Sequence, residues 1–440
     1  MIFIFFLFIC FYLPFQIALN PAPGIDLASI RIFILFLFFA WLYNRFKNKK
    51  EFFKFDAQAK LILFFLFLGA VSLFFAQNYG WALRKLAYLF SIFPIYFIAK
   101  SILDRREKII KTLEALVLSG LAVSIFGIFQ FFSQFFWSHE KISSVYLNFI
   151  GPVFWGENLT QMVLKYPSWF VGVSGQNYFR GIATFPDPHS FSLFLGMMLP
   201  LSVILFFTPH PEYSERVSTD KASKLMGAGL ISEKKKIWAI SFISIFLANI
   251  LTFSRGGYLA IASGALVFLF IFWKRMTGKY KLMTGLAVIF YVLMLTVPGP
   301  VSERFDSSFD LNEGSNAGRI NMWRKSLEII REKPFFGTGI GNFSLEVDNT
   351  AIYRNPIYAH NTYLDIAVEE GVLASAVWIL ILFITLLNFW IFSKRDMMYA
   401  GFFASLIIFS AHSLAETGLY SPVVLALFLI LISFNPRYEK

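Results

Sequence analysis

Charged residues are scarce in this 440-residue sequence: Asp, Glu, Lys and Arg make up 15% of it, against about 25% in a typical soluble domain. The sequence has one cysteine, Cys10, so no intramolecular disulfide can form and the redox compartment cannot be inferred from cysteine usage. Hydrophobic residues account for 57% of the chain and aromatic residues for 19%. This composition excludes an ordinary soluble domain and indicates an all-α integral membrane protein with many spans.

The hydrophobic residues are arranged in long runs. A membrane-spanning helix needs about 20 predominantly apolar residues, and twelve segments are candidates. They lie near 1–19, 25–43, 61–76, 82–99, 112–137, 190–207, 237–253, 257–273, 282–297, 372–392, 397–412 and 419–434. The first has no basic residues before its apolar run, so we interpret it as a span and not as a cleaved signal peptide.

The Lys and Arg residues predict the orientation, because cytoplasmic loops carry these residues in excess. Most of the 39 fall in every second connection, including the 44–60 and 208–236 segments, if both chain termini are cytoplasmic. The net charge of +12 then reflects topology and attraction to anionic lipids. No basic recognition element or zinc-like Cys/His spacing indicates a nucleic-acid partner.

Two connections on the predicted outer side are long, roughly 138–189 and 298–371. We therefore divide the chain into four parts. They are 1–137 with five spans, 138–297 with the first outer loop and spans six to nine, 298–371 as a large extracytoplasmic loop, and 372–440 with the last three spans. Function is expected in the two outer loops and at the span ends that they join.

Helix starts on the outer face carry ionisable residues. In FRGIATFPDPHSF, Arg180 precedes a helix for which Asp187 is the expected cap, Pro188 the first residue and His189 part of the first turn. Unpaired N–H groups at such a start favour an anion.

Two further stretches repeat this arrangement. Ser254 to Gly257, with the sequence SRGG, forms almost the whole connection between spans seven and eight, and its glycines allow close approach of a ligand or another backbone. Asn361 is the expected cap of a helix that continues into the tenth span, and His360 precedes it. We expect Arg180, Arg255 and His360 to meet around an anion such as pyrophosphate.

Each of these residues also has a purely structural interpretation. Arg255 can snorkel at a membrane boundary, Arg180 can be a solvated loop cation, and His360 can be a satisfied interfacial histidine. His189 can make a local hydrogen bond in its helical turn. The prediction of a site depends on the coincidence of Arg180, Arg255 and His360.

The large outer loop contains a predicted amphipathic helix. Ile320, Trp323, Leu327 and Ile330 form its apolar stripe, with Arg319 on another face. Pro334 stops the helix, and glycines at 337, 339 and 341 follow as a flexible turn.

The acidic residues near His360 do not form a recognisable metal site. Asp365, Glu369 and Glu370 follow His360 on one helix, and we interpret them as interfacial polar residues. His412 and Glu416, four residues apart, can assist an acceptor or pair with each other, and the local pair is favoured.

The strings SRGG, GRINMWRKSLEIIREKPFFGTGIGNF and AHNTYLDIAVEEGVLAS, in this order and spacing, resemble the O-antigen ligase family and the related O-antigen polymerases. The resemblance is strongest from about 175 to 375, whereas the first five spans match only in hydropathy. It implies a GT-C-type glycosyltransferase of the bacterial cytoplasmic (inner) membrane. Such an enzyme takes a glycan from undecaprenyl diphosphate on the periplasmic or outer face. The acceptor is lipid A core sugar in ligases, a second carrier-linked unit in polymerases and a protein hydroxyl in related members.

The resemblance also implies roles for individual residues. Arg180 matches the arginine before the sixth span, Arg255 that of the SRGG turn, His360 the histidine of the large loop, and Arg319 the arginine of the loop helix. His189 departs from the family, which often has a small amide residue there.

The implied chemistry needs neither metal nor cofactor. Arg180 and Arg255 would stabilise the charge of the departing diphosphate, and His360 would accept the proton of the attacking hydroxyl. The positive end of its helix is expected to keep His360 neutral, and attack opposite the leaving group inverts the anomeric centre. The alternative of a different class is a transporter of lipid-linked oligosaccharides. A transporter is expected to show repeats, broken helices and charges near mid-membrane, whereas here the charges gather on one face.

Overall fold

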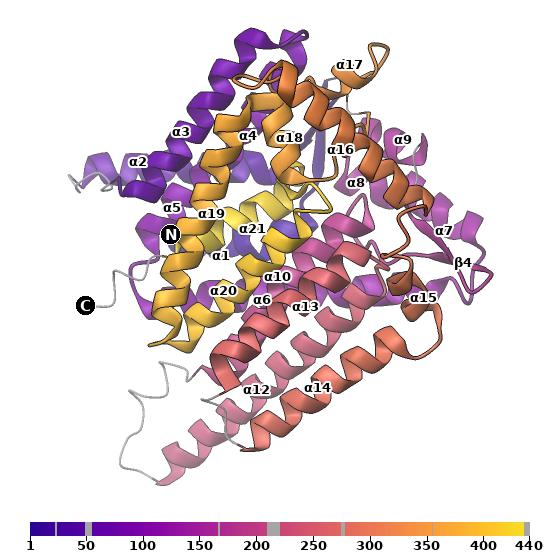
Figure 1. The fold of residues 1–440 in the computed structure, drawn as a ribbon. Coiled ribbons are helices and arrows are strands. Elements are labelled where there is room, and N and C mark those ends of the chain that lie inside the picture. Colours follow the sequence, from indigo (N-terminus) through magenta and orange to yellow (C-terminus); the bar gives the residue numbers. More distant parts are fainter. Residues whose placement is uncertain are drawn as a thin grey trace.

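The computed structural model describes residues 1–22, 24–48, 55–165, 168–208, 221–273, 278–353 and 355–434. Helices dominate this part of the chain (Figure 1). Each of the twelve predicted spans coincides with a helix or a broken pair of helices. These are α1 (Ile2–Tyr12) with η1 (Leu13–Phe15), α2 (Ser29–Lys47), α3 (Ala57–Ser72) with η2 (Leu73–Phe75), α4 (Tyr79–Ile92) with α5 (Pro94–Ile102), α6 (Arg106–Ser133), α10 (Pro188–Phe207), α12 (Lys221–Ile250), α13 (Arg255–Phe272), α14 (Gly278–Thr296), α19 (Val372–Ser393), α20 (Met397–His412) and α21 (Pro422–Ser433).

Seven helices of the described residues are long and apolar enough to cross a membrane, counting α4 with α5 as one. An eighth is added if Val288–Thr296 and Pro300–Asp306, bent by 81°, form one broken span. α1 with η1, α20 and α21 are apolar but shorter. The chain is thus a mostly helical, multi-pass membrane protein, and the count of twelve spans stays a prediction.

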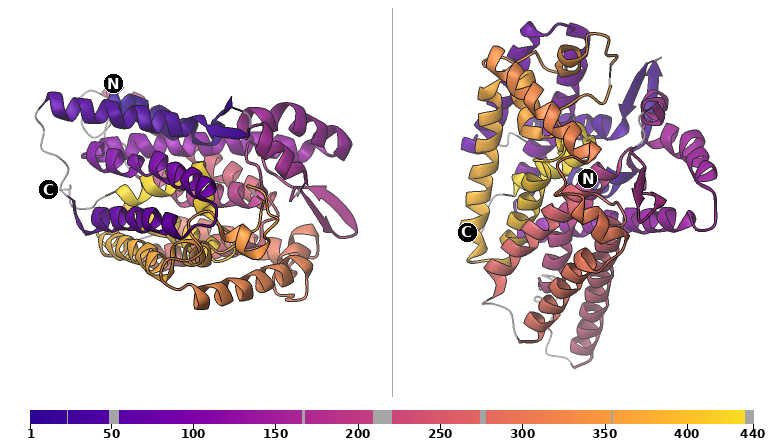
Figure 2. Two further views of the ribbon diagram at one scale, coloured as in Figure 1. Left: turned by 90° about the horizontal axis from the view of Figure 1, so that it is seen from above. Right: turned by 45° about the vertical axis from the view of Figure 1, so that its right-hand side comes forward.

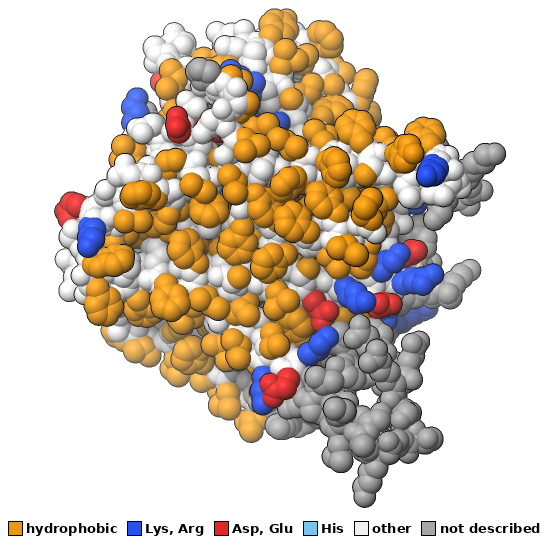
Figure 3. Space-filling model, turned by 180° about the vertical axis from the view of Figure 1, so that it is seen from behind, with side chains coloured by type: hydrophobic (Ala, Val, Ile, Leu, Met, Phe, Trp, Pro, Cys, Tyr) orange, Lys and Arg blue, Asp and Glu red, His pale blue; other side chains and the backbone are white. Residues whose placement is uncertain are grey.

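The helices differ in what surrounds them. α10 packs between α6, α12 and α20, and nearly every residue of α21 is buried, so both lie inside the bundle (Figures 1 and 2). Helices at the periphery of the bundle expose phenylalanines, among them Phe36 on α2, Phe129 on α6 and Phe270 on α13. Figure 3 shows hydrophobic side chains over a broad face of the molecule, with charged ones mainly toward its edges. Such a continuous apolar surface suits contact with lipid tails.

The expectation of an all-α fold needs one correction, because the structure contains two β-hairpins. β1 (Ala18–Ala22) pairs with β2 (Ile25–Ala28), and β3 (Phe170–Val173) pairs with β4 (Gln176–Phe179), both antiparallel. The first hairpin takes residues that were assigned to the ends of the first two spans. The helical run ends with η1, which contains Pro14, and Pro21 and Gly24 favour a turn between the two strands.

The segment 138–189 folds into α7 (His139–Val145), the π-helical turn η3 (Tyr146–Ile150), α8 (Gly151–Phe154), α9 (Glu157–Lys165) and the second hairpin. An apolar cluster that includes Tyr146, Trp155, Trp169 and Phe179 holds these pieces together. The carboxylate of Asp26, on β2, accepts the backbone N–H of Leu159 at 2.9 Å, which ties the first hairpin to α9.

The segment 298–371 contains α15 (Pro300–Asp306), α16 (Gly314–Glu332), α17 (Phe343–Val347) and α18 (Thr362–Glu370). Figures 1 and 2 place the helices of both long segments away from the chain termini. The predicted stripe on α16 is partly wrong: Trp323 and Ile330 pack inward with Ile329, but Leu327 is 47% exposed.

The predicted continuous helix from Asn361 into the tenth span is also wrong. Gly371, with φ of 91°, separates α18 from α19. A Cβ there would lie 2.0 Å from the carbonyl oxygen of Phe335, and one at Gly337 would lie 2.2 Å from that of Val368. The glycine turn after α16 is therefore buried against this helix break and is not an open loop.

Candidate active site

His360 lies in an unusual backbone conformation that its neighbours hold in place. Its φ is 50°, in the left-handed region that few non-glycine residues adopt. The preceding residue, Ala359, is bonded on both sides. Its N–H donates to Asp365 Oδ1 at 2.7 Å, and its carbonyl accepts from Trp323 Nε1 at 2.9 Å. α16 and α18 thus fix the peptide that directs His360.

The residues after His360 are joined to the loop that follows α20. The N–H of Thr362 donates to Ser413 O at 2.9 Å, and its hydroxyl donates to Glu416 O at 3.0 Å. Asn361 caps α18, as predicted, by accepting the N–H groups of Tyr363 and Leu364. These bonds bring Glu416 next to the imidazole.

Glu416 pairs with His360 and not, as the sequence suggested, with His412. Its Oε1 lies 3.3 Å from His360 Nδ1. Burial by itself would lower the pKa of His360, but the charge and the hydrogen bond of Glu416 raise it above the usual histidine value. Burial by itself would raise the pKa of Glu416, but His360 holds it well below the usual range. The expectation that the helix end keeps His360 neutral is therefore wrong, because a nearby carboxylate outweighs that effect.

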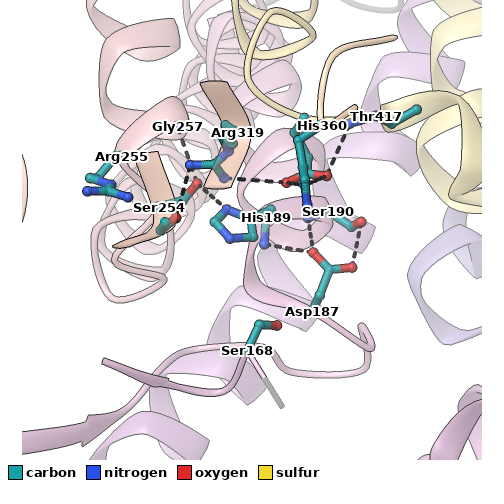
Figure 4. Close-up of polar contacts among 12 residues, drawn as sticks. Ser168, Asp187, His189, Ser190, Ser254, Arg255, Gly257, Arg319, His360 and Thr417 are labelled. Carbon is teal, nitrogen blue, oxygen red and sulfur yellow. Dashed lines mark hydrogen bonds and ion pairs between the residues drawn. The ribbon is translucent and has the colours of Figure 1, made fainter. Parts of the chain in front are cut away.

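Arg319 is the guanidinium found beside this pair. Its Nη2 lies 3.9 Å from Glu416 Oε2, and its side chain is 15% exposed. Among the described residues, its buried Nε has no hydrogen-bond partner. Figure 4 shows Arg319 between Arg255 and His360, with His189 below it. Arg319 therefore offers an unused N–H donor close to the imidazole.

Arg180 is 3% exposed and is bound to backbone carbonyls. Its Nε donates to Thr252 O at 2.7 Å, its Nη1 to Ser168 O at 3.1 Å and its Nη2 to Phe253 O at 3.2 Å. Burial, followed by repulsion from Arg304 and Arg319, lowers the pKa of Arg180 to about 9. Arg180 thus holds the backbone of the turn before the SRGG stretch, and the positive charges of Arg304 and Arg319 repel its own.

Arg255 is likewise buried and paired. Its Nη2 lies 3.0 Å from Glu313 Oε2, and its Nη1 donates to Ser307 O at 2.9 Å. Arg255 is the first residue of α13, with Ser254 as the cap, so the SRGG stretch is not a connection between helices. A Cβ on Gly257 would lie 2.0 Å from Ser192 Oγ, so that glycine admits α10.

The two predicted supporting histidines lie on different helices. The backbone N–H of His189 makes the expected local bond to Asp187 Oδ1 at 2.9 Å, and its Nδ1 lies 3.2 Å from Ser254 Oγ, which joins two helix starts. His412 is 1% exposed and packs beside Gly256. Neither of its ring nitrogens has a hydrogen-bond partner among the described residues.

The acidic residues of α18 are buried, which corrects their assignment as interfacial. Asp365 also accepts the hydroxyl of Thr417, and Glu369 forms an ion pair with Lys85 on α4. Burial raises the pKa of Asp365 to about 6 and that of Glu370 to about 8. Asp365 therefore joins the backbone before His360 to the loop that follows α20.

Sequence reasoning missed two contributors to this region. The partnership of Glu416 with His360 joins positions 56 residues apart, so no local spacing reveals it. Arg304, on α15, lies 3.8 Å from Glu313, the partner of Arg255. Its place beside a predicted span end could have drawn attention to it.

Comparison with known proteins adds a family match over part of the chain. Residues 240–379 match the model of the family described as O-Antigen ligase. This range includes Arg255, Arg319 and His360, while Arg180 and Glu416 lie outside it. No curated protein matches the sequence.

Proposed function

We propose that this chain, whose residues 240–379 match the O-antigen ligase family model, transfers a glycan from undecaprenyl diphosphate to an acceptor hydroxyl. The family assignment supports ligase- or polymerase-type activity on lipid-linked glycans in general. His360 is the proposed general base, and Arg180, Arg255 and Arg319 are proposed to hold the diphosphate.

The pairing of His360 with Glu416 is the observation that carries this proposal. An ionised Glu416 accepts the N–H at Nδ1, which fixes the tautomer in which Nε2 is free to take a proton. Because Glu416 raises the pKa of His360, the imidazole is a stronger base than an isolated histidine. A positioned base with an orienting carboxylate suits activation of a sugar hydroxyl.

The arginines supply the other half of the proposed site. Buried guanidinium groups that lower one another's pKa repel each other, and an anion among them relieves that repulsion. Arg180 uses three of its five N–H groups on carbonyls. The unused donors, together with Nε of Arg319, are suited to phosphate oxygens.

The proposed reaction balances without a metal. The acceptor hydroxyl gives its proton to His360 Nε2 while its oxygen bonds to the anomeric carbon. The bond from that carbon to the diphosphate breaks, and undecaprenyl diphosphate leaves with the electron pair. The arginines stabilise the charge that develops on it. Attack opposite the leaving group inverts the anomeric configuration.

We also propose the inner membrane as the location, with both termini cytoplasmic and the site outside. The concentration of Lys and Arg in the predicted inward loops supports this orientation, as does the gathering of both long segments away from the termini (Figure 2).

The test is glycan transfer by purified protein in lipid, with a labelled undecaprenyl diphosphate glycan as donor. His360→Ala is expected to lower the rate by about 10²- to 10⁴-fold while donor binding persists. His139→Ala, in the other outer segment, serves as the matched histidine control. Wild-type turnover by His360→Ala would remove the proposed base.

The acceptor decides among the related activities. Lipid A core, a second carrier-linked unit and a hydroxyl-bearing protein are offered separately, and a product with only one of them distinguishes ligase, polymerase and protein glycosylation. Movement of the donor across vesicles without any new glycosidic bond would instead indicate a transporter.

A further inference from the structure

A cavity of about 470 Å³, lined mostly by polar residues and glycines, lies between the second hairpin and the start of the 298–371 segment. Residues 172–177 form one wall, and Glu303, Arg304, Ser307 and Glu313 form the other. The volume is within the usual range of ligand sites, about 300–1,000 Å³. The proposed reaction assigns no part of the substrate to this cavity.

The hairpin is fixed against the opposite wall. The N–H of Ser174 donates to Glu303 Oε2 at 2.6 Å, and its hydroxyl donates to Oε1 at 2.7 Å. Ser174 and Gly175 have positive φ values and form the tip. The contact joins the two outer segments across the cavity, so the cavity is a built feature of the fold.

The two carboxylates of the walls are already bonded by protein groups, and Arg304 is partly paired. Glu303 receives both bonds from Ser174. Glu313 pairs with Arg255 and accepts the N–H groups of Ser315 and Asn316 at the start of α16. Arg304 lies 3.8 Å from Glu313 and donates to Phe253 O at 3.4 Å. A ligand in this cavity therefore needs no charged group of its own.

Neutral hydrogen-bonding groups remain for a ligand. Gln176 and Asn177 are exposed on the hairpin; Gln176 Oε1 accepts the hydroxyl of Tyr178 at 3.0 Å, which leaves the N–H groups of Gln176 and the amide of Asn177. Gly172 lies opposite Asn177 in the strand register, and no atom lies within 4 Å of a Cβ built on Gly172. The Asn177 amide thus has no cross-strand side chain to cover it. Val173 is the one apolar side chain in the lining, which does not suit a lipid tail.

The position of the cavity ties it to the proposed diphosphate site. Ser307 and Glu313 line the cavity and also bind the Arg255 guanidinium. A ligand in the cavity is therefore separated from Arg255 by single side chains.

We propose that this cavity is a glycan subsite that holds sugar units of the carrier-linked substrate beyond the one that reacts. The inference rests on the proposed function and adds where the polyhydroxylated chain binds. The side-chain amides on the hairpin both donate and accept hydrogen bonds, which suits the hydroxyl groups of a sugar chain. The walls come from both outer segments, so the subsite forms only when the two are docked.

The test fills the cavity without touching the proposed catalytic residues. Asn177→Trp is expected to raise KM at least tenfold for a donor with several sugars, with kcat within twofold of wild type. For a donor with a single sugar, both constants should stay within twofold. Gly172→Val is a second variant, since valine suits a strand and its side chain meets open space. Asn148→Trp, an exposed position of the same outer segment, is the control.

A direct binding measurement separates this proposal from the proposed reaction. Oligosaccharide released from the labelled donor is titrated against detergent-solubilised protein. Asn177→Trp should weaken its binding at least tenfold, and His360→Ala should not change it. Equal KM increases for both donors, or unchanged binding in both cavity variants, would overturn the subsite. Activity of His360→Ala would instead overturn the proposed base and leave the binding result intact.

Discussion

The two sides of the candidate site hold their functional side chains in different ways. Arg180 and Arg255 are buried and bound largely to backbone carbonyls and to one carboxylate, Glu313. His360 is 30% exposed at its side chain and depends on Glu416 for its charge state. The arginine side is thus a fixed scaffold of positive charge, whereas the histidine side has an adjustable proton affinity. Group transfer from a diphosphate needs both kinds of support.

Among changes that leave His360 in place, replacing a fixed cation should have the largest effect. Arg255→Lys keeps the charge but loses the forked contacts with Glu313 and Ser307, because the single nitrogen of an ammonium cannot replace the separate donors Nη1 and Nη2. We expect kcat/KM to fall by about 100-fold, in line with about 1.5–3 kcal/mol for each hydrogen bond to a charged group. Steady-state kinetics measure the change, and Arg324→Lys, at an exposed position of α16, is the control. Near-normal turnover would show that Arg255 acts only as a point charge.

Removing the Glu416 carboxylate should change the pH dependence that His360 gives to the reaction. Because His360 must be neutral to accept a proton, activity rises with pH through its pKa and levels off above it. Glu416 raises that pKa, so Glu416→Gln should move the acidic limb of the kcat profile to lower pH and reduce the plateau by about tenfold. A limb that stays in place would mean that another group titrates there.

A smaller effect is expected from the peptide before His360. Trp323→Phe removes the bond to Ala359 O but keeps most of the ring packing. Loss of about 1 kcal/mol predicts about a fivefold drop in kcat with little change in KM. Trp378→Phe is a matched control, since Trp378 is buried and its Nε1 has no partner among the described residues. A drop of similar size in both variants would assign the effect to general packing.

Metal removal should have the smallest effect of all. The proposed reaction stabilises the leaving diphosphate with guanidinium groups alone, so exhaustive chelation is expected to leave transfer rates unchanged within error. A strict requirement for Mg²⁺ or Mn²⁺ in the same assay would redirect the mechanism toward the acidic residues.

The sequence predicted local features well. Apolar runs located the twelve helical units, and short-range chemistry identified the caps Asp187 and Asn361. It did not predict what long-range packing decides. The break at Gly371 exists because the 335–337 turn approaches the backbone there, and the carboxylate that sets the charge of His360 comes from beyond α20. Asn-Pro-Ala-Pro-Gly did carry a turn signal, but the hydrophobicity around it concealed the first hairpin.

The burial of nearly every residue of α21 bears on how the protein is assembled. A helix that is surrounded by other helices cannot occupy the lipid-facing edge of the bundle. It can therefore pack only after the surrounding helices have been inserted. A chain stopped before Pro422 would present an unfilled interior to the bilayer. Such a chain would contain the 138–189 and 298–371 segments but would lack the helix that fills the centre of the bundle, so we expect it to be degraded.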